Sequence, residues 1–289
     1  MKCILFKCLN KNKEDKFVSG KLYLVATPIG NLEDITLRAL RILKEVDIIA
    51  AEDTRTTLKL LNHYEIKKPL ISYHRHNEED REETLILKLK EGKNIAIVSD
   101  AGTPGISDPG EVIVKKAIEE QIEIIPIPGA CAAINALISS GLNTKEFVFY
   151  GFLPLNNKLR KEKLEELKQE TKTAIIYEAP HKIKSTLEDL RECIGIRNVV
   201  LAREITKIHE EFIRGNIEEI IKKSENLKGE MILLIEGGKK EEQENFLNNL
   251  SLEEHYEFYK NQGFDKKEII KKIAKDRGTP KNEIYKRFC

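Results

Sequence analysis

The chain has 289 residues, of which 40% are hydrophobic and 34% charged, a composition typical of globular proteins. Its net charge of +1 excludes a uniform polycation, and no apolar run approaches the roughly 18 residues that span a bilayer. The five cysteines form no C-x-x-C pair, which favours a reducing, cytoplasmic setting without disulfides or a zinc site. The length suits about two domains of ordinary size.

Residues 1–19 contain an apolar stretch too short for a secretory signal, and we expect them to form an N-terminal extension. Apolar runs that predict buried strands follow at 21–26, 47–51, 69–73, 94–98 and 122–127. Amphipathic segments separate these runs, with Asn77 and Asp108 as expected helix caps. This alternation predicts a parallel sheet with helices on both faces, in a first α/β domain over 20–130.

A second α/β domain is expected over 131–240. Its predicted strands lie at 147–151, 173–178, 198–204, 209–215 and 230–237, and its predicted helices near 157–170, 181–193 and 216–224. Only a few residues separate 198–204 from 209–215, so these runs are expected to form a hairpin in a mixed sheet. A charged linker, KKEEQENF, then leads to a helical module over 248–289.

Three turn-rich segments follow the predicted strands of the first domain: ATPIGN (26–31), AEDTRTT (51–57) and SDAGTPGISDPG (99–110). A fourth, PIPGACAA (126–133), leads into the second domain. Open α/β sheets bind ligands outside the carboxyl ends of their strands, and glycines allow the backbone to approach a ligand closely. The chain has neither G-x-x-x-x-G-K-[ST] nor G-x-G-x-x-G, which disfavours P-loop kinases and Rossmann dehydrogenases.

These segments, with SYHRHNE, FYGFLP, YEAPHKI and LAREITKIHEEFIRG, follow one another in an order that is similar to one known family. The chain resembles the small-subunit ribosomal RNA cytidine-2′-O-methyltransferases, which belong to the tetrapyrrole-methylase-like (class III) S-adenosylmethionine enzymes. The resemblance runs from about Lys21 to the C-terminus. It implies a homodimer of chains with two α/β domains and S-adenosylmethionine in the cleft between them.

The resemblance also implies a set of cofactor-binding residues. They are Pro28, Asp100, Ala101, Gly102, Thr103, Ala130, Cys131, Tyr177, Ala179 and Met231. Asp100 matches the acid that follows a strand in the superfamily's G-D-P motif. Cys131 stands where a serine is common.

Methyl transfer from a sulfonium to a ribose hydroxyl requires close alignment and benefits from a general base or a polarising cation. The catalytic candidates are Asp53, Arg55, His76, Glu78 and Arg203, with His74, Glu178, His181, Lys182 and Glu204 as further polar residues at the cleft edge. Alternatively, Asp53 caps the helix that begins at Thr54, and Arg203 pairs with Glu204. The two histidines are expected on opposite faces of an extended segment, without a third ligand for a metal.

Residues 259–289 hold ten Lys/Arg against four Asp/Glu, a net charge of +6. They read as two helices joined at 276–279 and resemble the family's C-terminal helix-turn-helix-like module. Such a surface suits an RNA backbone; the alternatives are a solvated helix face, a lid or a dimer-packing element.

The implied substrate is 16S rRNA or the small ribosomal subunit, with no membrane or DNA partner. Two other hypotheses are methylation of a tetrapyrrole or a protein side chain on the same fold, and a non-catalytic RNA-binding assembly factor.

Overall fold

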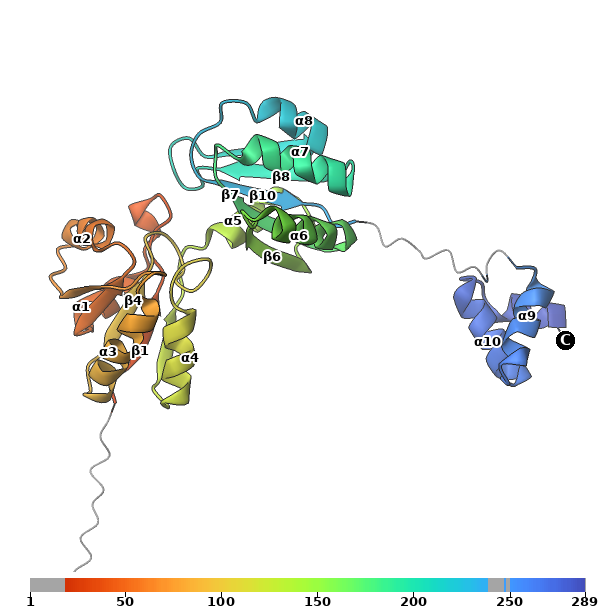
Figure 1. The fold of residues 1–289 in the computed structure, drawn as a ribbon, viewed down its shortest axis with the longest axis horizontal. Coiled ribbons are helices and arrows are strands. Elements are labelled where there is room, and N and C mark those ends of the chain that lie inside the picture. Colours follow the sequence, from red (N-terminus) through yellow and green to blue (C-terminus); the bar gives the residue numbers. More distant parts are fainter. Residues whose placement is uncertain (1–18, 239–246, 248–249, 289) are drawn as a thin grey trace, which may run out of the picture. The chain divides into compact units, whose positions relative to one another are not determined.

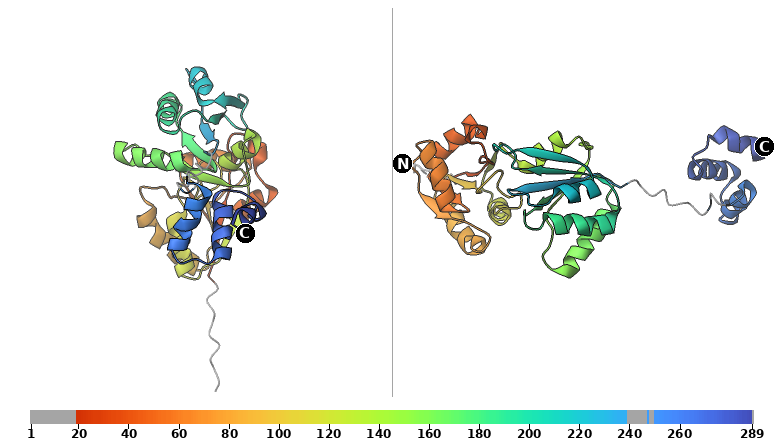
Figure 2. Two further views of the ribbon diagram at one scale, coloured as in Figure 1. Left: turned by 90° about the vertical axis from the view of Figure 1, so that its right-hand side faces the viewer. Right: turned by 90° about the horizontal axis from the view of Figure 1, so that it is seen from above.

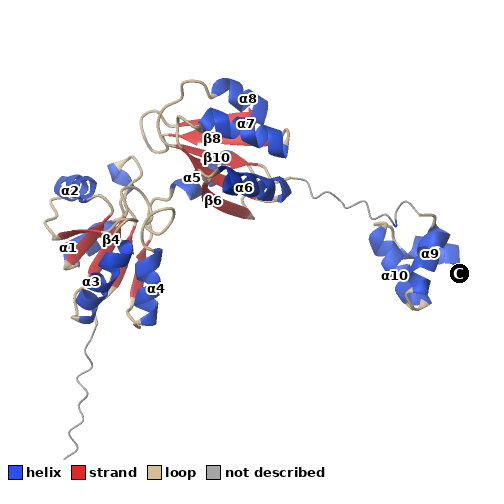
Figure 3. Cartoon of the chain, in the orientation of Figure 1, coloured by secondary structure: helices blue, strands red, loops and turns tan. Residues whose placement is uncertain are grey.

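The computed structural model describes residues 19–238, 247 and 250–288, and the chain divides into one compact unit up to Gly238 and another from Lys239. The first unit contains two five-stranded sheets, and the second is helical (Figures 1 and 3). The expected extension, apart from residue 19, and the linker at 239–246 lie outside the described residues. None of the described helices combines the length and the apolar character needed to cross a bilayer.

The first sheet is parallel throughout, in the order β3-β2-β4-β1-β5. Its strands are β1 (Leu22–Val25), β2 (Ile48–Ala51), β3 (Leu70–Ser72), β4 (Ile95–Val98) and β5 (Ile124–Ile127). The 3-10 helix η1 (Leu32–Asp34) and the helices α1 (Leu37–Glu45), α2 (Thr54–His63), α3 (Glu78–Lys90) and α4 (Glu111–Glu119) connect them. The predicted parallel sheet is therefore confirmed.

Successive residues of these short strands point to opposite faces, and both faces are buried. Ala96 and Val98 of β4 pack with α1 and α2, whereas Ile95 and Ile97 pack with α3 and α4. This is why the strands read as continuous apolar runs, and why helices cover both faces of the sheet (Figure 3).

The second sheet is mixed, in the order β6-β7-β10-β8-β9. Its strands are β6 (Phe147–Phe152), β7 (Thr173–Glu178), β8 (Asn198–Arg203), β9 (Glu211–Asn216) and β10 (Met231–Ile235). Only β6 and β7 run parallel, and β8 and β9 form the predicted antiparallel hairpin. The helices are α5 (Ala132–Ser140), α6 (Asn157–Gln169), α7 (Ile183–Ile194) and α8 (Ile217–Lys223).

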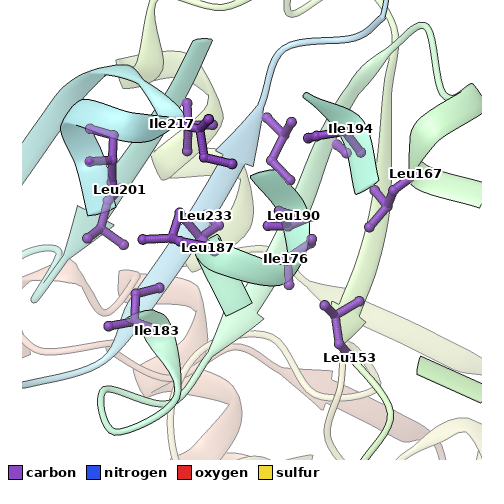
Figure 4. Packing of buried hydrophobic residues seen from close by; sticks show 14 of the residues in the cluster. Leu153, Leu167, Ile176, Ile183, Leu187, Leu190, Ile194, Leu201, Ile217 and Leu233 are labelled. Atoms are coloured by element: carbon purple, nitrogen blue, oxygen red, sulfur yellow. The ribbon is translucent and has the colours of Figure 1, made fainter. Parts of the chain in front are cut away.

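One face of this sheet packs against α6, α7 and α8, with Leu187 and Leu190 of α7 lying over Ile176 and Leu233 of the strands (Figure 4). The opposite face packs against α5. Ile29, from the loop after β1, joins that second cluster. A residue from a loop of the first sheet is thus part of the core between the second sheet and α5.

The C-terminal unit consists of the helices α9 (Leu252–Asn261), α10 (Lys266–Asp276) and α11 (Lys281–Phe288) (Figure 2). These helices pack around their own apolar core. Two capping boxes begin its helices, Ser251 with Glu254 at α9 and Asp265 with Glu268 at α10. The predicted turn at 276–279 lies between α10 and α11. The domain boundary expected at 130/131 stays a prediction.

One of the two expected helix caps is wrong. The helix after SDPG begins at Glu111 rather than at Pro109, and its N-cap is Gly110, whose φ of 146° suits glycine. Asp108 therefore caps no helix. Asn77 does occupy the N-cap of α3, but its Oδ1 accepts a hydrogen bond from the amide of His74 instead of from the helix.

Candidate functional site

A cavity of about 440 Å³ brings residues of both α/β domains together, and we call it the central cavity. Its lining comprises Ile29, Glu52, residues 100–103, 106–108, 131–132, Phe152, residues 177–180, Ile205 and residues 230–232. The volume lies within the range of small-molecule sites. The carboxyl ends of β2, β4 and β7 all contribute to it, as expected for a ligand site in an α/β protein.

The loop after β4 is held in place by the loop after β1. Thr27 and Gly102 form an isolated antiparallel bridge in which each amide donates to the other's carbonyl, at 2.8 and 3.1 Å. Gly102 has a φ of 89°, and a Cβ there would lie 3.2 Å from Cγ2 of Ile29. The Thr103 hydroxyl also donates to the carbonyl of Ala130 at 3.0 Å. Glycine at 102 thus allows the loop to lie against Ile29.

Eight of the ten residues expected to bind a cofactor line the central cavity, namely Asp100, Ala101, Gly102, Thr103, Cys131, Tyr177, Ala179 and Met231. The other two lie beside it. Pro28 is buried next to the lining residue Ile29, and Ala130 contributes the carbonyl that Thr103 binds. Their binding role stays a prediction.

Three carboxyl groups line one part of the cavity: Glu52, Asp100 and Asp108. Desolvation raises the pKa of each, and raises that of Asp108 to about 6, with the neighbouring charges of Glu52 and Asp100 adding to the rise. Arg75 opposes the shift at Glu52 and Asp108 and donates a hydrogen bond to the carbonyl of Ser107, and Arg55 opposes the shift at Asp100. This region therefore favours cationic or hydroxyl-bearing ligand groups.

Apolar side chains form much of the remaining wall of the cavity, which also includes Glu178 and Glu230. The Tyr177 ring lies edge-on to Phe149 and Phe152, with centroids 5.0 and 5.6 Å apart, and desolvation raises its pKa to about 12. Met231 and Ile232 continue the wall from β10. Such a surface suits the flat face of a ring system.

Glu178 lines the cavity, but its carboxylate is already bonded on the protein side. It accepts from the Thr186 hydroxyl at 2.6 Å and from the amide of Ala179 at 2.8 Å. These bonds fix the end of β7. The contacts of Glu178 with described residues therefore indicate a structural role.

The five catalytic candidates lie outside the set of described residues that line the cavity. The Asp53 carboxylate accepts from the amide of Arg55 and pairs with its guanidinium at 2.7 Å, which lowers the pKa of Asp53 to about 2. Asp53 thus caps α2, as the alternative predicted. His76 is exposed, and Glu78 accepts a 3.5 Å hydrogen bond from Tyr73. A catalytic role for these residues stays a prediction.

Two expected arrangements are wrong. Arg203 pairs with Glu211 at 2.7 Å and not with Glu204, which pairs with Lys207 at 3.0 Å. His74 and His76 do not lie on opposite faces of an extended segment, because residues 75–77 form a turn that brings their ring centroids within 6.0 Å. Within the described ranges, no three His, Cys, Asp or Glu residues are grouped to hold a metal ion.

Sequence reasoning missed Glu52, Asp108 and Arg75. Glu52 stands next to Asp53 at the end of β2, and Asp108 lies in the same segment as Asp100. The signal that could have found Glu52 is its position directly after one apolar run, as Asp100 follows another by two residues. That signal becomes specific only when β2 and β4 are known to be neighbours.

Comparisons with known proteins show the family of the chain. The family model of tetrapyrrole (corrin/porphyrin) methylases matches residues 21–221. "Ribosomal RNA small subunit methyltransferase I" of Halalkalibacterium halodurans is 53% identical, over 95% of this chain and 96% of that protein. The proteins of that name from Bacillus subtilis and Synechocystis are 51% and 49% identical, each over 92% of this chain and 93% and 96% of their own lengths.

Solved structures show the same fold at low sequence identity. The methyltransferase CobJ is 18% identical with a TM-score of 0.59, covering 76% of this chain and 95% of that one. Uroporphyrin-III C-methyltransferase from Thermus thermophilus, complexed with S-adenosyl homocysteine, is 16% identical with a TM-score of 0.55, covering 75% and 97%. The chain therefore belongs to the tetrapyrrole methylase family, in the branch of the proteins named ribosomal RNA small subunit methyltransferase I.

Proposed function

We propose that this protein transfers a methyl group from S-adenosylmethionine to the ribose 2′-oxygen of a cytidine in 16S rRNA, in the decoding centre of the small subunit. The observation that carries the proposal is the central cavity, whose lining combines the carboxyl groups of Glu52, Asp100 and Asp108 with an apolar surface that includes Tyr177 and Met231. The relatives' printed name, which specifies ribosomal RNA of the small subunit, supports the choice of substrate.

The described residues fit S-adenosylmethionine. Its sulfonium and amino groups are cationic, and its ribose carries hydroxyls that donate hydrogen bonds. Glu52 and Asp100 supply carboxylate acceptors for these groups. Tyr177 and Met231 supply an apolar surface for the adenine, and the volume of about 440 Å³ suits one such molecule.

When bound, S-adenosylmethionine supplies a methyl group whose bond to sulfur breaks as the bond to the ribose oxygen forms. The chain must align the two reactants and exclude water. The apolar wall serves the exclusion of water. The hydroxyl must also lose its proton. We propose Asp108 as the acceptor, because its pKa of about 6 leaves it ionised yet basic at neutral pH.

An RNA substrate also needs a surface for its phosphates. Lys267, Lys271 and Lys275 stand at every fourth position of α10, all exposed, and none forms an ion pair with a described residue. We call these three residues the α10 lysine stripe. We propose that this stripe binds the RNA backbone.

We also propose that the protein acts in the cytoplasm as a homodimer, without a DNA or membrane partner.

The test is transfer of labelled methyl from S-adenosylmethionine to small ribosomal subunits from cells that lack the protein, followed by digestion of the RNA. We expect label in 2′-O-methylcytidine with the wild type and its loss with Asp100→Ala. Asp80→Ala, a change of an exposed aspartate on α3, is the matched control.

Each other outcome selects a different hypothesis. Label on a base would contradict the ribose as acceptor. Cofactor binding without labelled RNA would favour a tetrapyrrole or protein substrate. RNA binding without cofactor binding would favour an assembly factor.

A further inference from the structure

A second, open hollow of about 540 Å³ adjoins the central cavity, and we call it the Pro180 hollow. It is lined by residues 180–181 and 183–184, at and before the start of α7, and by residues 224–229, before β10. Pro180 lines both the hollow and the central cavity. A substrate that reaches the edge of the central cavity at Pro180 therefore also lies next to the hollow.

The hollow combines cations with an apolar base. Ile183 belongs to the core cluster between the second sheet and helices α6–α8, and the partly buried Leu227 packs against that cluster. The Lys228 ammonium forms no ion pair with a described residue, whereas Lys184 is paired with Glu225 at 2.7 Å. His181 is exposed at the rim. A lysine ammonium, an apolar floor and an exposed ring together suit a nucleotide, with the phosphate at the ammonium and the base against the ring.

The segment that carries Lys228 is fixed to the sheet. Arg203 donates to the carbonyl of Lys228 at 3.1 Å while it pairs with Glu211 on the neighbouring strand. Gly229 follows in the left-handed region, with a φ of 91°, and a Cβ there would lie 2.2 Å from Oε1 of Glu204. The position of Lys228 is therefore set by Arg203 and by the close approach of Glu204.

We propose that the Pro180 hollow binds the RNA nucleotide next to the methylated one. Its phosphate pairs with Lys228, and its base lies against Pro180 and His181. A strand that presents its target ribose at the edge of the central cavity, beside the bound cofactor, must place its neighbouring nucleotide close by. The hollow is next to that edge, because Pro180 lines both. Arg203 is then a positioning residue. The proposal rests on the proposed function and names the substrate contact of that site.

The test measures KM for small ribosomal subunits, kcat, and the Kd of S-adenosylmethionine for full-length Lys228→Glu, Lys228→Ala and His181→Ala. We expect KM to rise about tenfold for Lys228→Glu and less for the two alanine variants, because one phosphate contact and one stacking contact are lost. The Kd for S-adenosylmethionine and the Tm should not change.

Lys161→Glu is the matched control, because Lys161 is an exposed lysine in a separate hollow along α6. Arg203→Ala should raise KM as Lys228→Ala does, since it releases the Lys228 segment, and Arg203→Lys should restore part of the effect.

The proposal is overturned if Lys228→Glu changes KM no more than Lys161→Glu does while the wild type methylates RNA. If the wild type transfers no methyl group to RNA, the proposed function fails and this inference fails with it. A fall in kcat at unchanged KM would also contradict a binding role for the hollow.

Discussion

The main-chain amide of Asp53 donates a hydrogen bond to Oδ1 of Asp100, with 3.0 Å between nitrogen and oxygen. The bond joins the segments that follow β2 and β4, which are neighbours in the sheet. The side chain of Asp53 meanwhile caps α2 and pairs with Arg55. Asp53 thus supports Asp100 through its main chain, which a side-chain substitution leaves in place.

Asp53→Ala should therefore reduce stability more than cofactor binding. Loss of the N-cap leaves an amide of the first turn of α2 without its acceptor, so we expect Tm to fall by a few degrees. Asp53→Asn retains a capping oxygen and serves as the matched control. Calorimetry gives both Tm and the Kd of S-adenosylmethionine, which should stay within about threefold of the wild type. A large loss of affinity in both variants would mean that the Asp53 carboxylate itself contacts the ligand.

Asp108 predicts the pH dependence of the reaction. Its pKa of about 6 means that the carboxylate gains a proton, and can no longer accept one, as the pH falls through 6. We expect kcat/KM of the wild type, which reports the pKa of the free enzyme, to fall about tenfold per pH unit below that value. Asp108→Asn should reduce kcat by about 10² or more and abolish this acid limb. An unchanged limb in the variant would assign the titration to another group.

The same residue should behave in the opposite way in stability. The pKa of Asp108 rises from 3.8 to about 6 on folding, so the protonated carboxyl is favoured in the native state and stability is lost as the pH rises through 6. The shift corresponds to roughly 3 kcal/mol at most, which nearby solvent reduces to about 1–2 kcal/mol. Urea unfolding at pH 8 should show Asp108→Asn to be more stable by that amount. The difference should vanish near pH 4, and a destabilised variant at pH 8 would contradict the argument.

The strands of the first sheet could be predicted from the sequence because both of their faces are buried. Ile95–Val98 has no polar residue, and such a run between turn segments is readily recognised. Predicted boundaries differ from the observed ones by one or two residues, as at 122–127 against Ile124–Ile127. The cap at Asp108 was wrong because an aspartate before a proline is a common helix start, whereas here Gly110 adopts a conformation that places the start later.

The site could be predicted only in part. The loop of Asp100 is recognisable from its glycines and from the resemblance that it carries. The carboxyl group of Glu52 is 48 residues away, and only the pairing of β2 with β4 brings it to the same cavity. Local periodicity contains no information on strand order, so the acidic cluster was not predicted. The hydrogen bond from Arg203 to the carbonyl of Lys228 could not be predicted either. It depends on the path of the loop before β10, and no sequence motif specifies that path.

The C-terminal unit should lose stability in acid through His255. This side chain is fully buried, accepts a hydrogen bond at Nδ1 from Nε of Arg277, and lies 3.2 Å from Asp276, which also binds the Tyr259 hydroxyl. Burial lowers the pKa of His255 below 6.5, and the Arg277 charge adds to this, although Asp276 opposes it. The folded unit therefore favours the neutral ring, and its stability is lost as the pH falls from about 6.5.

Hydrogen exchange in the full-length protein tests this prediction. We expect the amides of α9–α11 to exchange faster at pH 5 than at pH 7.5, after correction for the intrinsic rate, while those of β10 do not. His255→Gln retains a donor and an acceptor without titrating, so its α9–α11 amides should lose this pH dependence. Equal pH dependence in the variant would show that another group is responsible.

The α10 lysine stripe should account for much of the salt-dependent affinity for RNA. Four residues of helix rise by about 6 Å, so Lys267, Lys271 and Lys275 form a row of charges that can follow successive phosphates of one strand. The triple change to glutamine should weaken binding about tenfold or more and reduce the slope of log K against log salt by about 2. The triple change of Lys158, Lys161 and Lys168 on α6 removes the same charge from the other unit and is the control. Equal losses of RNA affinity in the two triple variants would mean that net charge, rather than the stripe, determines affinity. A loss of RNA affinity in the α10 variant alone, with unchanged S-adenosylmethionine binding, would assign the RNA backbone contact to the C-terminal unit.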